Sequence, residues 1–516
     1  MVTLALIGAL LVGVVMAADN FVTSPDTSGD VGGFASLVLD SSGNPVVSYY
    51  DATNDDLRIL HCGDPNCTSG NVITSPDTAG VVGDQTSLVL DGSGNPVVSY
   101  SDATNSNLKV LHCGDPNCTS GNVITSPDAG TITNLFSSLA LDSSGNPVVS
   151  YLDLSALSLK VLHCGDPNCS SGNVITLPDG PHAGRPLVGL FTSLALDSSD
   201  NPVISYLEHD NSSSASLKLL HCGDPNCTSA NVITSPAIGG VFSGPTSLVL
   251  DSSGNPVVGF GTATGTLLVL HCGNPICQSS STVITAPDTG GYFTSLVLDS
   301  GGNPVVSYLD SDFASPGLAD LKILHCGDPS CSSGNVITVP DTATGSVPFK
   351  FGTSTSLVLD SSGNPVVSYF DQLNRDLKVL HCGNPSCDTD SDGDGILDLA
   401  DSCPNDPKND SDGDGVCGDI DNCPSTPNPD QANADGDARG DVCDVCPDDA
   451  GSTSNGGCPF PPSIGGVVEL AVGSGDSPLE RQTGGAPERE VAAILVALAA
   501  AGVAGMSWRR YRRRAG

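Results

Sequence analysis

A unit of about 50 residues recurs seven times along the chain, and this internal repeat constrains the fold more than any other feature. The first copy runs from Ser36 to Asp77 and contains two cysteines separated by four residues. The seven cysteine pairs are Cys62/Cys67, Cys113/Cys118, Cys164/Cys169, Cys222/Cys227, Cys272/Cys277, Cys326/Cys331 and Cys382/Cys387. A period of this length predicts that the chain stacks one supersecondary unit many times.

Each copy contains four short apolar runs that are rich in β-branched residues and bounded by turn residues. In the first copy these runs are residues 36–40, 45–49, 57–61 and 71–74. The first two are joined by D-S-S-G-N-P, whose Gly and Asn tolerate a positive φ. Four strands in about 50 residues form a sheet of the size of one propeller blade. We therefore predict an all-β fold, a seven-bladed β-propeller over residues 19–387.

The two ends of the repeat region indicate a closed ring. The seventh copy ends at Cys387 without its fourth apolar run, and a matching run stands at the other end of the region. Residues 20–26, NFVTSPD, resemble the NVITSPD of other copies and precede the first complete copy. A ring closed by this N-terminal strand leaves no unpaired edge at the junction, whereas an open solenoid does not need such a strand. A β-solenoid is the alternative.

The repeat resembles, in its architecture, the bacterial propellers of the sialidase-like and Asp-box group. Its turn D-S-S-G-N-P departs from the Asp-box pattern S-x-D-x-G-x-T-W because it lacks the aromatic residue. The resemblance implies an extracellular sialidase-like glycoside hydrolase as the alternative function. Such an enzyme needs three clustered Arg, a Tyr nucleophile paired with a Glu, and an acid/base Asp. The ring contains only Arg58, Arg185, Arg375 and one Glu, Glu208, at unmatched repeat positions. We therefore expect no enzyme.

The cysteine pairs are predicted to be disulfides, because each C-x4-C loop joins two paired strands and the spacing is regular. Disulfides in this number predict an exported protein. Zinc is the alternative, since a His precedes the first Cys of every pair. The spacing offers at most three ligands, so we expect structural histidines instead. They are His61, His112, His163, His221, His271, His325 and His381.

Loop lengths distinguish the two faces of the predicted ring. The turn between the first and second strands hardly varies, whereas the loops after the second and fourth strands do. Both variable loops emerge on one side of an antiparallel blade, and such a face often binds ligands. Six copies carry an acid where the second strand reaches this face, which predicts either an acidic ligand face or an Asp that caps its own turn. These acids are Asp51, Asp102, Asp153, Glu208, Asp310 and Asp371.

The most specific motif follows the repeats and consists of three Asp-rich loops. Calcium prefers six to eight oxygen ligands from one short segment, with carboxylates at positions 1, 3, 5, 9 and 12 and a Gly at position 6. The first loop fits this pattern throughout, the second has Gly418 at position 9, and the third has Ala438 at position 6. The predicted calcium ligands are Asp390, Asp392, Asp394, Asp398 and Asp401; Asp410, Asp412, Asp414 and Asp421; and Asn433, Asp435, Asp437, Asp441 and Asp444.

The sequences D-S-C-P, D-N-C-P and G-D-V-C-D after the acidic runs resemble thrombospondin type 3 repeats, and the resemblance covers residues 388–459. It implies calcium ions along an extended, disulfide-linked stalk with little apolar core. An acidic solvated linker is the alternative. Much of the formal net charge of −40 lies in this stretch. Clustered carboxylates hold cations, and they argue against nucleic acid as a partner.

The chain ends predict export and membrane anchoring. Residues 1–18 resemble a signal peptide, although no cationic residue precedes the apolar run. Residues 460–490 are predicted to be a flexible linker. Residues 491–508 carry no charge and are nearly long enough as a helix to cross the ~30 Å hydrocarbon core. The Arg-rich residues 509–516 should stay cytoplasmic. Together these features predict a single-pass cell-surface protein whose propeller binds an extracellular glycan, protein or surface and whose stalk binds calcium.

Overall fold

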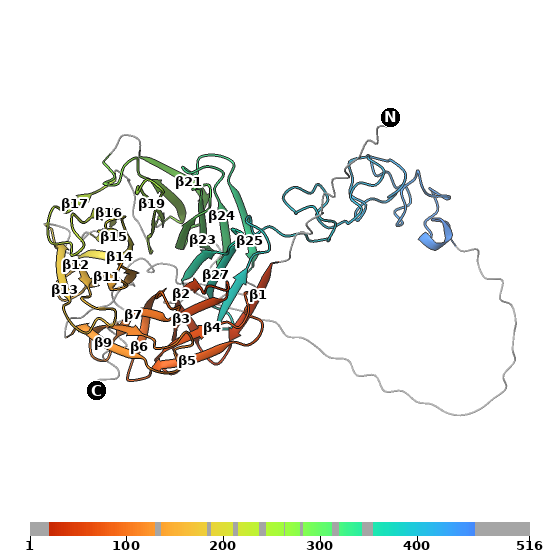
Figure 1. The fold of residues 1–516 in the computed structure, drawn as a ribbon. Helices are drawn as coiled ribbons and strands as arrows, with labels where there is room; N and C mark the ends of the chain where they lie inside the picture. The colour runs from red at the N-terminus through yellow and green to blue at the C-terminus, as the bar shows by residue number, and fades with distance from the viewer. Residues whose placement is uncertain are drawn as a thin grey trace, which may run out of the picture. The chain divides into compact units, whose positions relative to one another are not determined.

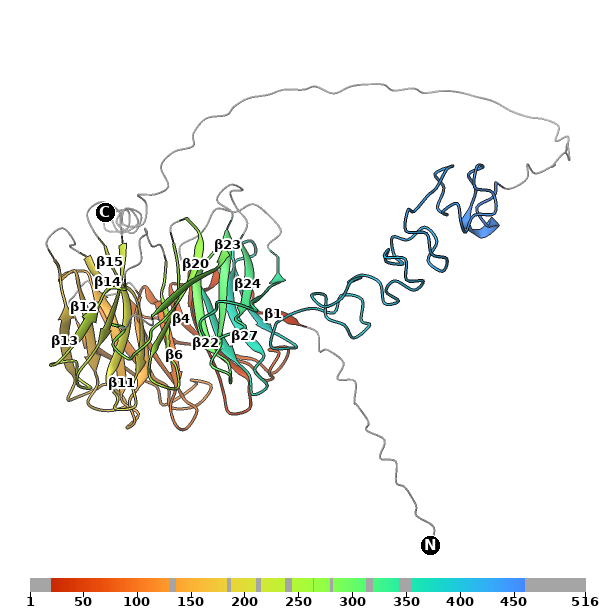
Figure 2. The ribbon, with the colours of Figure 1, turned by 90° about the horizontal axis from the view of Figure 1, so that it is seen from above.

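The computed structural model describes residues 20–129, 136–182, 187–209, 215–236, 244–262, 264–278, 282–311, 319–342 and 354–459. In this part of the chain seven four-stranded antiparallel sheets surround a common axis (Figure 1), and the side view shows them as the blades of a ring (Figure 2). The predicted all-β, seven-bladed propeller is therefore confirmed. Apart from strands, the described residues contain one short 3-10 helix, η1 (Thr453–Asn455).

The strands follow one another outwards from the axis in each blade (Figure 1). Blades one to three consist of β2 (Val31–Leu39), β3 (Pro45–Asp51), β4 (Asp56–His61) and β5 (Val72–Asp77); β6 (Val82–Leu90), β7 (Pro96–Asp102), β8 (Asn107–His112) and β9 (Val123–Asp128); and β10 (Ser138–Leu141), β11 (Pro147–Asp153), β12 (Ser158–His163) and β13 (Val174–Asp179). Blades four to six consist of β14 (Leu187–Leu196), β15 (Pro202–His209), β16 (Ala215–His221) and β17 (Val232–Thr234); β18 (Ser247–Leu250), β19 (Pro256–Gly261), β20 (Thr266–His271) and β21 (Val283–Thr289); and β22 (Tyr292–Leu298), β23 (Pro304–Ser311), β24 (Ala319–His325) and β25 (Val336–Asp341). Blade seven consists of β26 (Thr355–Leu359), β27 (Pro365–Asp371), β28 (Asp376–His381) and β1 (Phe21–Asp26).

The second strand of each blade is buried on both faces because neighbouring blades pack against it. In β3, Val46, Val47 and Tyr49 are all fully buried. The apolar clusters contain residues of adjacent blades, so Val46 of blade one packs with Val98 and Tyr100 of blade two. Tyr residues at the position of Tyr49 therefore pack between adjacent blades. Apolar packing between adjacent blades therefore stabilises the ring.

The ring closes through its N-terminal strand. β1 pairs antiparallel with β28, with Phe21 opposite His381, Val22 opposite Leu380 and Thr23 opposite Val379. The strand order of blade seven is β1-β28-β27-β26, so the missing fourth strand comes from the other end of the repeat region. The predicted closure is confirmed, and the solenoid alternative is wrong.

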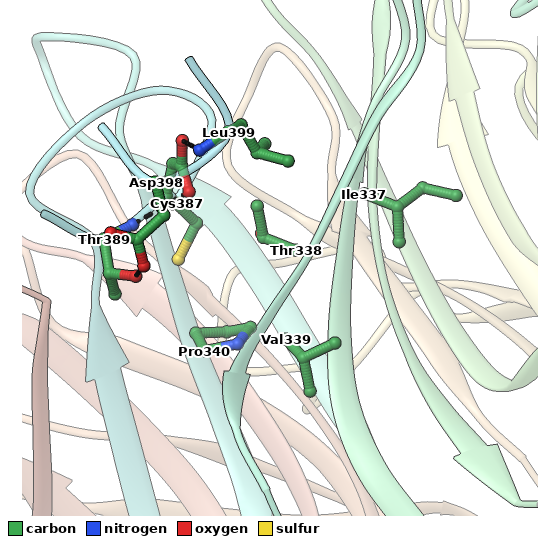
Figure 3. Close-up of a pocket in the computed structure, with 9 residues that line it drawn as sticks. Ile337, Thr338, Val339, Pro340, Cys387, Thr389, Asp398 and Leu399 are labelled. Atoms are coloured by element: carbon green, nitrogen blue, oxygen red, sulfur yellow. Dashed lines mark hydrogen bonds between the residues drawn. The ribbon is translucent and has the colours of Figure 1, made fainter. Parts of the chain in front are cut away.

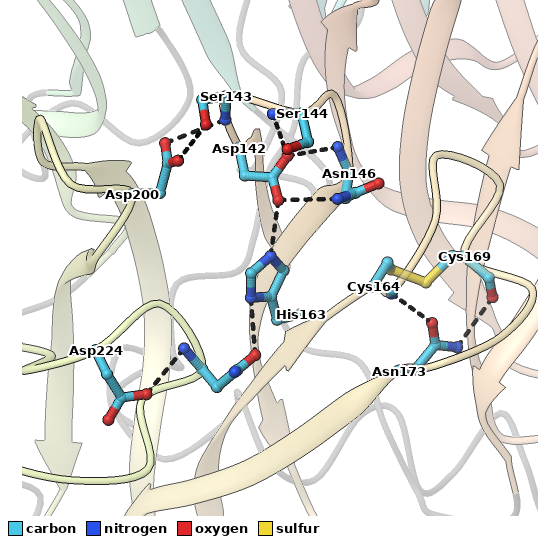
Figure 4. Close-up of polar contacts among 12 residues, drawn as sticks. Asp142, Ser143, Ser144, Asn146, His163, Cys164, Cys169, Asn173, Asp200 and Asp224 are labelled. Atoms are coloured by element: carbon cyan, nitrogen blue, oxygen red, sulfur yellow. Dashed lines mark hydrogen bonds and ion pairs between the residues drawn. A yellow bond between two sulfur atoms is a disulfide. The ribbon is translucent and has the colours of Figure 1, made fainter.

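All seven C-x4-C pairs form disulfides, as predicted, and no cysteine is free. The histidine before each pair faces a carboxylate of its own blade. In blade three, His163 Nε2 lies 2.9 Å from Asp142 Oδ2, and His163 Nδ1 lies 2.9 Å from Asn226 Oδ1 of blade four (Figure 4). The same Nε2 contact with an Asp occurs in all seven blades. These histidines therefore tie the turn between the first two strands to the third strand, which supports the structural interpretation over zinc.

A feature that the sequence reading missed lies on the innermost strands. Phe34, Phe136, Phe191 and Phe293 occupy equivalent positions and adopt positive φ angles of 54° to 75°, as Gln85 does at 59° in blade two. Their carbonyls turn towards the next blade, where a hydroxyl donates to them; Thr86 Oγ1, for instance, lies 2.8 Å from the Phe34 carbonyl oxygen. The left-handed backbone at this position thus links successive blades around the axis. Its signal in the sequence is the Phe two residues before S-L in four copies.

The chain divides into two compact units at Pro407/Lys408, twenty residues after the predicted end of the propeller at Cys387. The first Asp-rich loop therefore belongs to the propeller unit, and the second and third loops belong to the other unit. The predicted signal peptide, linker, membrane helix and basic tail lie outside the described residues. Within the described part, no helix is both long and apolar enough to cross a membrane.

Candidate functional site

Three groups of carboxylates come together in the Asp-rich region, one in each predicted calcium loop. In each group, one oxygen per residue lies within 4.8 Å of the corresponding oxygens of the other two. The groups are Asp390, Asp392 and Asp394; Asp410, Asp412 and Asp414; and Asp435, Asp437 and Asp444. The structure thus brings together positions 1, 3 and 5 in the first two loops and positions 3, 5 and 12 in the third.

The backbone shapes each loop around the side chain at position 1. Asp390 Oδ1 accepts the Gly393 N–H at 2.8 Å, and Asp390 Oδ2 accepts the Gly395 N–H at 2.9 Å. Asp410 makes the same two hydrogen bonds with Gly413 and Gly415 at 2.8 Å each. These bonds turn the chain back on itself, which gathers the carboxylates of positions 1, 3 and 5 at one point.

Position 4, rather than position 6, carries the glycine that all three loops require. Gly393, Gly413 and Gly436 have φ angles of 78°, 78° and 73°, in the left-handed region that other residues rarely adopt. Position 6 is left-handed only in the first two loops. Ala438, at position 6 of the third loop, is absent from the positive-φ residues. The sequence departure at Ala438 therefore does not break the third loop.

Several carboxylate oxygens in the loops are buried and have no hydrogen-bond partner. At position 3 these are Asp392 Oδ2, both oxygens of Asp412, and Asp435 Oδ2. At position 12 the same holds for Asp401 Oδ2 and Asp444 Oδ2. Buried oxygens of this kind are costly unless another group compensates them. A hard cation with oxygen ligands compensates several of them at once, so the residues present fit calcium.

The acids at position 9 have a different place from the predicted one. Asp398 Oδ1 accepts the Ser391 N–H at 2.8 Å, and Asp441 Oδ1 accepts the Ala434 N–H at 2.7 Å. Neither is among the grouped carboxylates. They hold the backbone at position 2 of their loops. In the second loop the Gly418 N–H donates to the Asn409 carbonyl at 3.3 Å, and the equivalent backbone bond is present in the other two loops.

The closeness of the carboxylates in each loop affects their pKa values. Burial, and then the neighbouring carboxylates Asp414, Asp421 and Asp410, raise the pKa of Asp412. Backbone N–H donors, with that of Gly415 first, lower the pKa of Asp410. Asp421 at position 12 thus acts electrostatically on position 3. A divalent ion at this point relieves the repulsion and competes with protons.

Disulfides connect segments of the Asp-rich region. Cys423 pairs with Cys443, and Cys446 pairs with Cys458. Cys403 and Cys417 are disulfide-bonded as well. The connections support the disulfide-linked region that the sequence resemblance implies.

The first loop lies against the propeller at blade six. A shallow cavity of ≈ 230 Å³ separates Ile337–Pro340 of β25 from Cys387–Thr389, Asp398 and Leu399 (Figure 3). Asp388 Oδ2 accepts the Leu399 N–H at 3.2 Å, and Thr338 Oγ1 donates to the Ser386 carbonyl at 3.1 Å. The first loop is thereby joined to the last disulfide of the ring.

On the propeller, all six acids of the predicted ligand face form an ion pair with a Lys or Arg, and Asp51, Asp102, Asp153 and Asp371 also accept hydrogen bonds from their own turns. Asp102 Oδ1 accepts the Asn105 N–H at 2.9 Å, and Asp102 Oδ2 lies 2.9 Å from Lys109 Nζ. Asp51, Asp102, Asp153 and Glu208 are buried, while Asp310 and Asp371 are half-buried. The hydrogen bonds fit the turn-capping interpretation, because few of these oxygens face solvent.

Each ion pair extends across the blade interface. Lys109 Nζ also lies 2.8 Å from Oδ2 of Asp77, which ends the outer strand of blade one, and the Tyr100 hydroxyl donates to the same oxygen at 2.8 Å. Although burial alone would raise it, hydrogen bonds from Asn105 and Lys109 lower the pKa of Asp102. Equivalent groups of an Asp, a Tyr and a Lys or Arg occupy six of the seven junctions. Between blades three and four the Tyr206 hydroxyl donates to Asp179, while Lys218 pairs with Glu208.

Blade five has lost this network as a unit. Phe260, Thr262 and Leu268 replace the Tyr, the acid and the Lys, and Ala237 replaces the Asp of the preceding outer strand. Four changes at four separate positions of one junction indicate that the polar group is retained or discarded together. A partial network leaves a buried charge without its partner, which is costly.

A single substitution in the network is therefore expected to cost more than replacement of the whole group. Lys109→Leu leaves Asp77 and Asp102 without their cation, and we expect a loss of about 3–5 kcal/mol in the free energy of unfolding. Asp77→Ala/Tyr100→Phe/Asp102→Thr/Lys109→Leu, which copies the blade-five residues, should cost less than the single change. Urea unfolding of the calcium-loaded chain measures both. Additive losses in the fourfold variant would contradict the idea that the network acts as a unit.

The arginines that a sialidase needs are not gathered in the described part of the ring. Arg58 pairs with Asp26 and Asp51 in the blade-one network, and Arg375 lies 3.6 Å from Asp30 with its side chain half exposed. Arg185 lies outside the described residues. These positions give no geometric support to the hydrolase alternative.

Solved structures similar to the ring come from several bacteria. A Dyadobacter fermentans protein of unknown function shares 12% identity, with a TM-score of 0.45 and coverage of 71% of this chain and 98% of that one. The BP39L lectin of Burkholderia pseudomallei shares 13% identity, with a TM-score of 0.43 and coverage of 70% and 95%. The NanB sialidase of Streptococcus pneumoniae shares 13% identity, with a TM-score of 0.36 and coverage of 70% of each chain. At such identities and TM-scores the likeness carries no functional argument.

The sequence comparisons identify a known family only in the Asp-rich region. None of the curated proteins matches the chain. The thrombospondin type 3 repeat family matches twice, at residues 386–409 and 408–431, which contain the first two loops. The third loop, at 433–444, lies beyond the match and has the same left-handed glycine and the same unpartnered oxygen at position 3. The chain therefore carries thrombospondin type 3 repeats at residues 386–431, directly after a seven-bladed β-propeller.

Proposed function

We propose that the chain is a cell-surface protein whose three Asp-rich loops bind calcium and thereby order a stalk that presents the propeller. The observation that carries the calcium proposal is the buried, unpartnered oxygen at position 3 of every loop, on Asp392, Asp412 and Asp435. Each lies beside two further carboxylates. Position 12 supplies another such oxygen in the first and third loops. Calcium would supply charge neutralisation and cross-linking at these points.

We further propose that the propeller is a non-enzymatic binding module for an extracellular glycan, protein or surface. The connections that vary in length join strand ends on one side of the blades, and those between Asp341 and Thr355 and between Ser311 and Ala319 are long. The opposite face is formed by turns of nearly constant sequence, whose polar side chains are used internally. The many disulfides support an extracellular setting, and the uncharged residues 491–508 would supply the membrane anchor.

Equilibrium calcium binding tests the metal proposal. Calorimetric titration of the full chain should give three ions per chain, and Asp392→Asn, Asp412→Asn and Asp435→Asn should each remove one. Asp448→Asn, outside the loops, is the matched control and should leave three. A variant series in which the stoichiometry does not fall would overturn the assignment of these loops.

The binding proposal needs a different measurement. The calcium-loaded chain should bind members of a printed glycan array or a defined surface and should not hydrolyse a fluorogenic sialoside. Turnover of the sialoside at a rate that depends on the chain would favour the hydrolase alternative.

A further inference from the structure

Blade two differs from the other blades where its innermost strand, β6, begins and the next strand, β7, ends. Asp84 and Gln85 lie side by side on β6, and Ser101 lies opposite Asp84 on β7. Residues directly opposite each other on antiparallel strands point to the same face of the sheet. Asp84 is half-buried, and Gln85 and Ser101 are each 4% exposed. Three polar residues therefore occupy neighbouring positions on the two inner strands of this blade.

No other blade carries a carboxyl or a carboxamide group at the positions of Asp84 and Gln85, although blade seven carries Thr353 and Ser354 there. The residues equivalent to Asp84 include Gly33 and Leu190, and those equivalent to Gln85 include Phe34 and Phe191. The residues equivalent to Ser101 are Tyr50, Leu152, Leu207, Gly261, Leu309 and Phe370. Because the fold forms with Gly33, Phe34 and Tyr50 in blade one, it does not itself require a polar group here. The carboxyl and the carboxamide are confined to blade two, and such a departure from the repeat points to a task other than folding.

Within the described part of the chain, two polar atoms at this place have no hydrogen-bond partner. Asp84 Oδ1 and Gln85 Nε2 are both buried and make no hydrogen bond. Burial raises the pKa of Asp84 to about 7, and only the Gln85 backbone N–H acts against it. The network of blade two does not reach Asp84, since Lys109 is paired with Asp77 and Asp102. The blade thus leaves one acceptor and one donor unused, at a cost that a ligand would offset.

We propose that Asp84 and Gln85, with Ser101 beside them, form a binding site for a neutral, hydroxyl-rich ligand, a saccharide unit. The unused carboxyl oxygen accepts a hydrogen bond and the unused amide donates one. Adjacent hydroxyls of a sugar offer a donor and an acceptor together. A cation would meet the Gln85 amide N–H, and an anion would meet the Asp84 carboxyl. This inference rests on the proposed binding function and gives it a location and a ligand class.

The repeat supplies its own test variant. Asp84→Gly/Gln85→Phe places the blade-one residues Gly33 and Phe34 in blade two, in a backbone that already accepts them. The mirror variant Gly33→Asp/Phe34→Gln alters blade one and leaves the proposed site intact. Far-UV circular dichroism and thermal unfolding verify that each variant folds. Asp84→Asn, which keeps the shape and changes the hydrogen-bond capacity, serves as a second probe of the site.

Binding is measured by saturation-transfer NMR on the full, calcium-loaded chain with the methyl glycosides of glucose, galactose, mannose and N-acetylglucosamine. We expect at least one glycoside to bind, and its affinity to fall about tenfold or more in Asp84→Gly/Gln85→Phe. Asp84→Asn should weaken it, and the mirror variant should leave it unchanged. Equal binding by the unaltered chain and by Asp84→Gly/Gln85→Phe would overturn this site while the proposed binding function stands. Failure of the unaltered chain to bind any glycoside, or binding of methylammonium in its place, would overturn the saccharide site.

Discussion

A chain that lacks residues 20–26 is expected to lose much of the stability of its ring. The deletion removes β1, which pairs with β28 and closes blade seven. It also removes Asp26, which is 2% exposed and accepts hydrogen bonds from Tyr49 and Arg58 of blade one. Breaking a buried ion pair on one side costs about 3–5 kcal/mol. Spread over a ring of this size, that loss alone lowers the melting temperature by roughly 5 °C.

The expected fall is measured by calorimetry on the calcium-loaded chain with and without residues 20–26. Two further chains make the result specific. Asp26→Asn in the full chain keeps the strand and weakens the ion pair, so its melting temperature should lie between those of the two parents. A synthetic peptide of residues 20–26, added to the truncated chain, should restore part of the loss because the vacated edge of β28 is available to pair. An unchanged melting temperature after deletion would contradict closure through β1.

The ring itself could be predicted because its information is local and repeated. The sequence of each copy predicts the same four strands and the same turns, and the unmatched strand at residues 20–26 indicates how the ring closes. The left-handed backbone at Phe34 is marked in the sequence by a Phe in four copies, but its role could not be foreseen from one copy. Its positive φ serves a hydrogen bond between Thr86 and the Phe34 carbonyl, in two different blades. Contacts between copies carry no periodic signature within one copy.

The calcium loops show a similar division between composition and conformation. The spacing of Asp390, Asp392 and Asp394 was sufficient to predict that these carboxylates converge. The same spacing assigned Asp398 to the ion, whereas the structure uses it to hold the Ser391 backbone. A list of acids at fixed positions does not distinguish a ligand from a loop-closing residue, because both need a carboxylate near the same turn.

The acids of the predicted ligand face show that burial can change the interpretation of a sequence pattern. From the sequence, Asp102 marks the rim of a ring face. In the structure it is fully buried and shared between Asn105 and Lys109. The loss of its counterpart at Thr262, together with Leu268 in the Lys position, was present in the sequence as a correlated change. Comparison of all four network positions across copies, rather than of the acid alone, would have indicated an ion pair.

Removal of calcium is expected to have the largest effect on residues 388–459. Residues 388–449 contain nineteen Asp against Lys408 and Arg439. Their apolar side chains do not form a core, because Leu399, Ile420 and Val445 are 60%, 71% and 73% exposed. Disulfides alone leave the repulsion among carboxylates in place. The free energy that orders the loops must therefore come from bound cations.

The magnitude follows from linkage. If each loop binds calcium at about 10⁻⁴ M, as extracellular sites do, 10 mM calcium stabilises each by about 2.7 kcal/mol, a factor of ~100 in the population of the opened state. Proteolysis that acts on the opened state should accelerate by a similar factor in a chelator. The described ring, whose strands are held by blade packing, should keep its resistance. Limited proteolysis with mass spectrometry of the fragments measures both regions in one experiment.

The variant Asp390→Ala/Asp392→Ala/Asp394→Ala tests the same dependence on calcium in the first loop alone. Without these carboxylates the first loop loses its ion and the hydrogen bonds of Asp390 to Gly393 and Gly395. Cleavage near Ile396, which is 42% exposed, should then occur even in 10 mM calcium. Asp448→Ala/Asp449→Ala removes two acids outside the loops and should leave the pattern unchanged. Since the first loop also lies against β25, its opening should spread to the cavity beside Leu399 and not to the loops after Lys408. Equal resistance of the unaltered chain in calcium and in chelator would show that cations do not order this region.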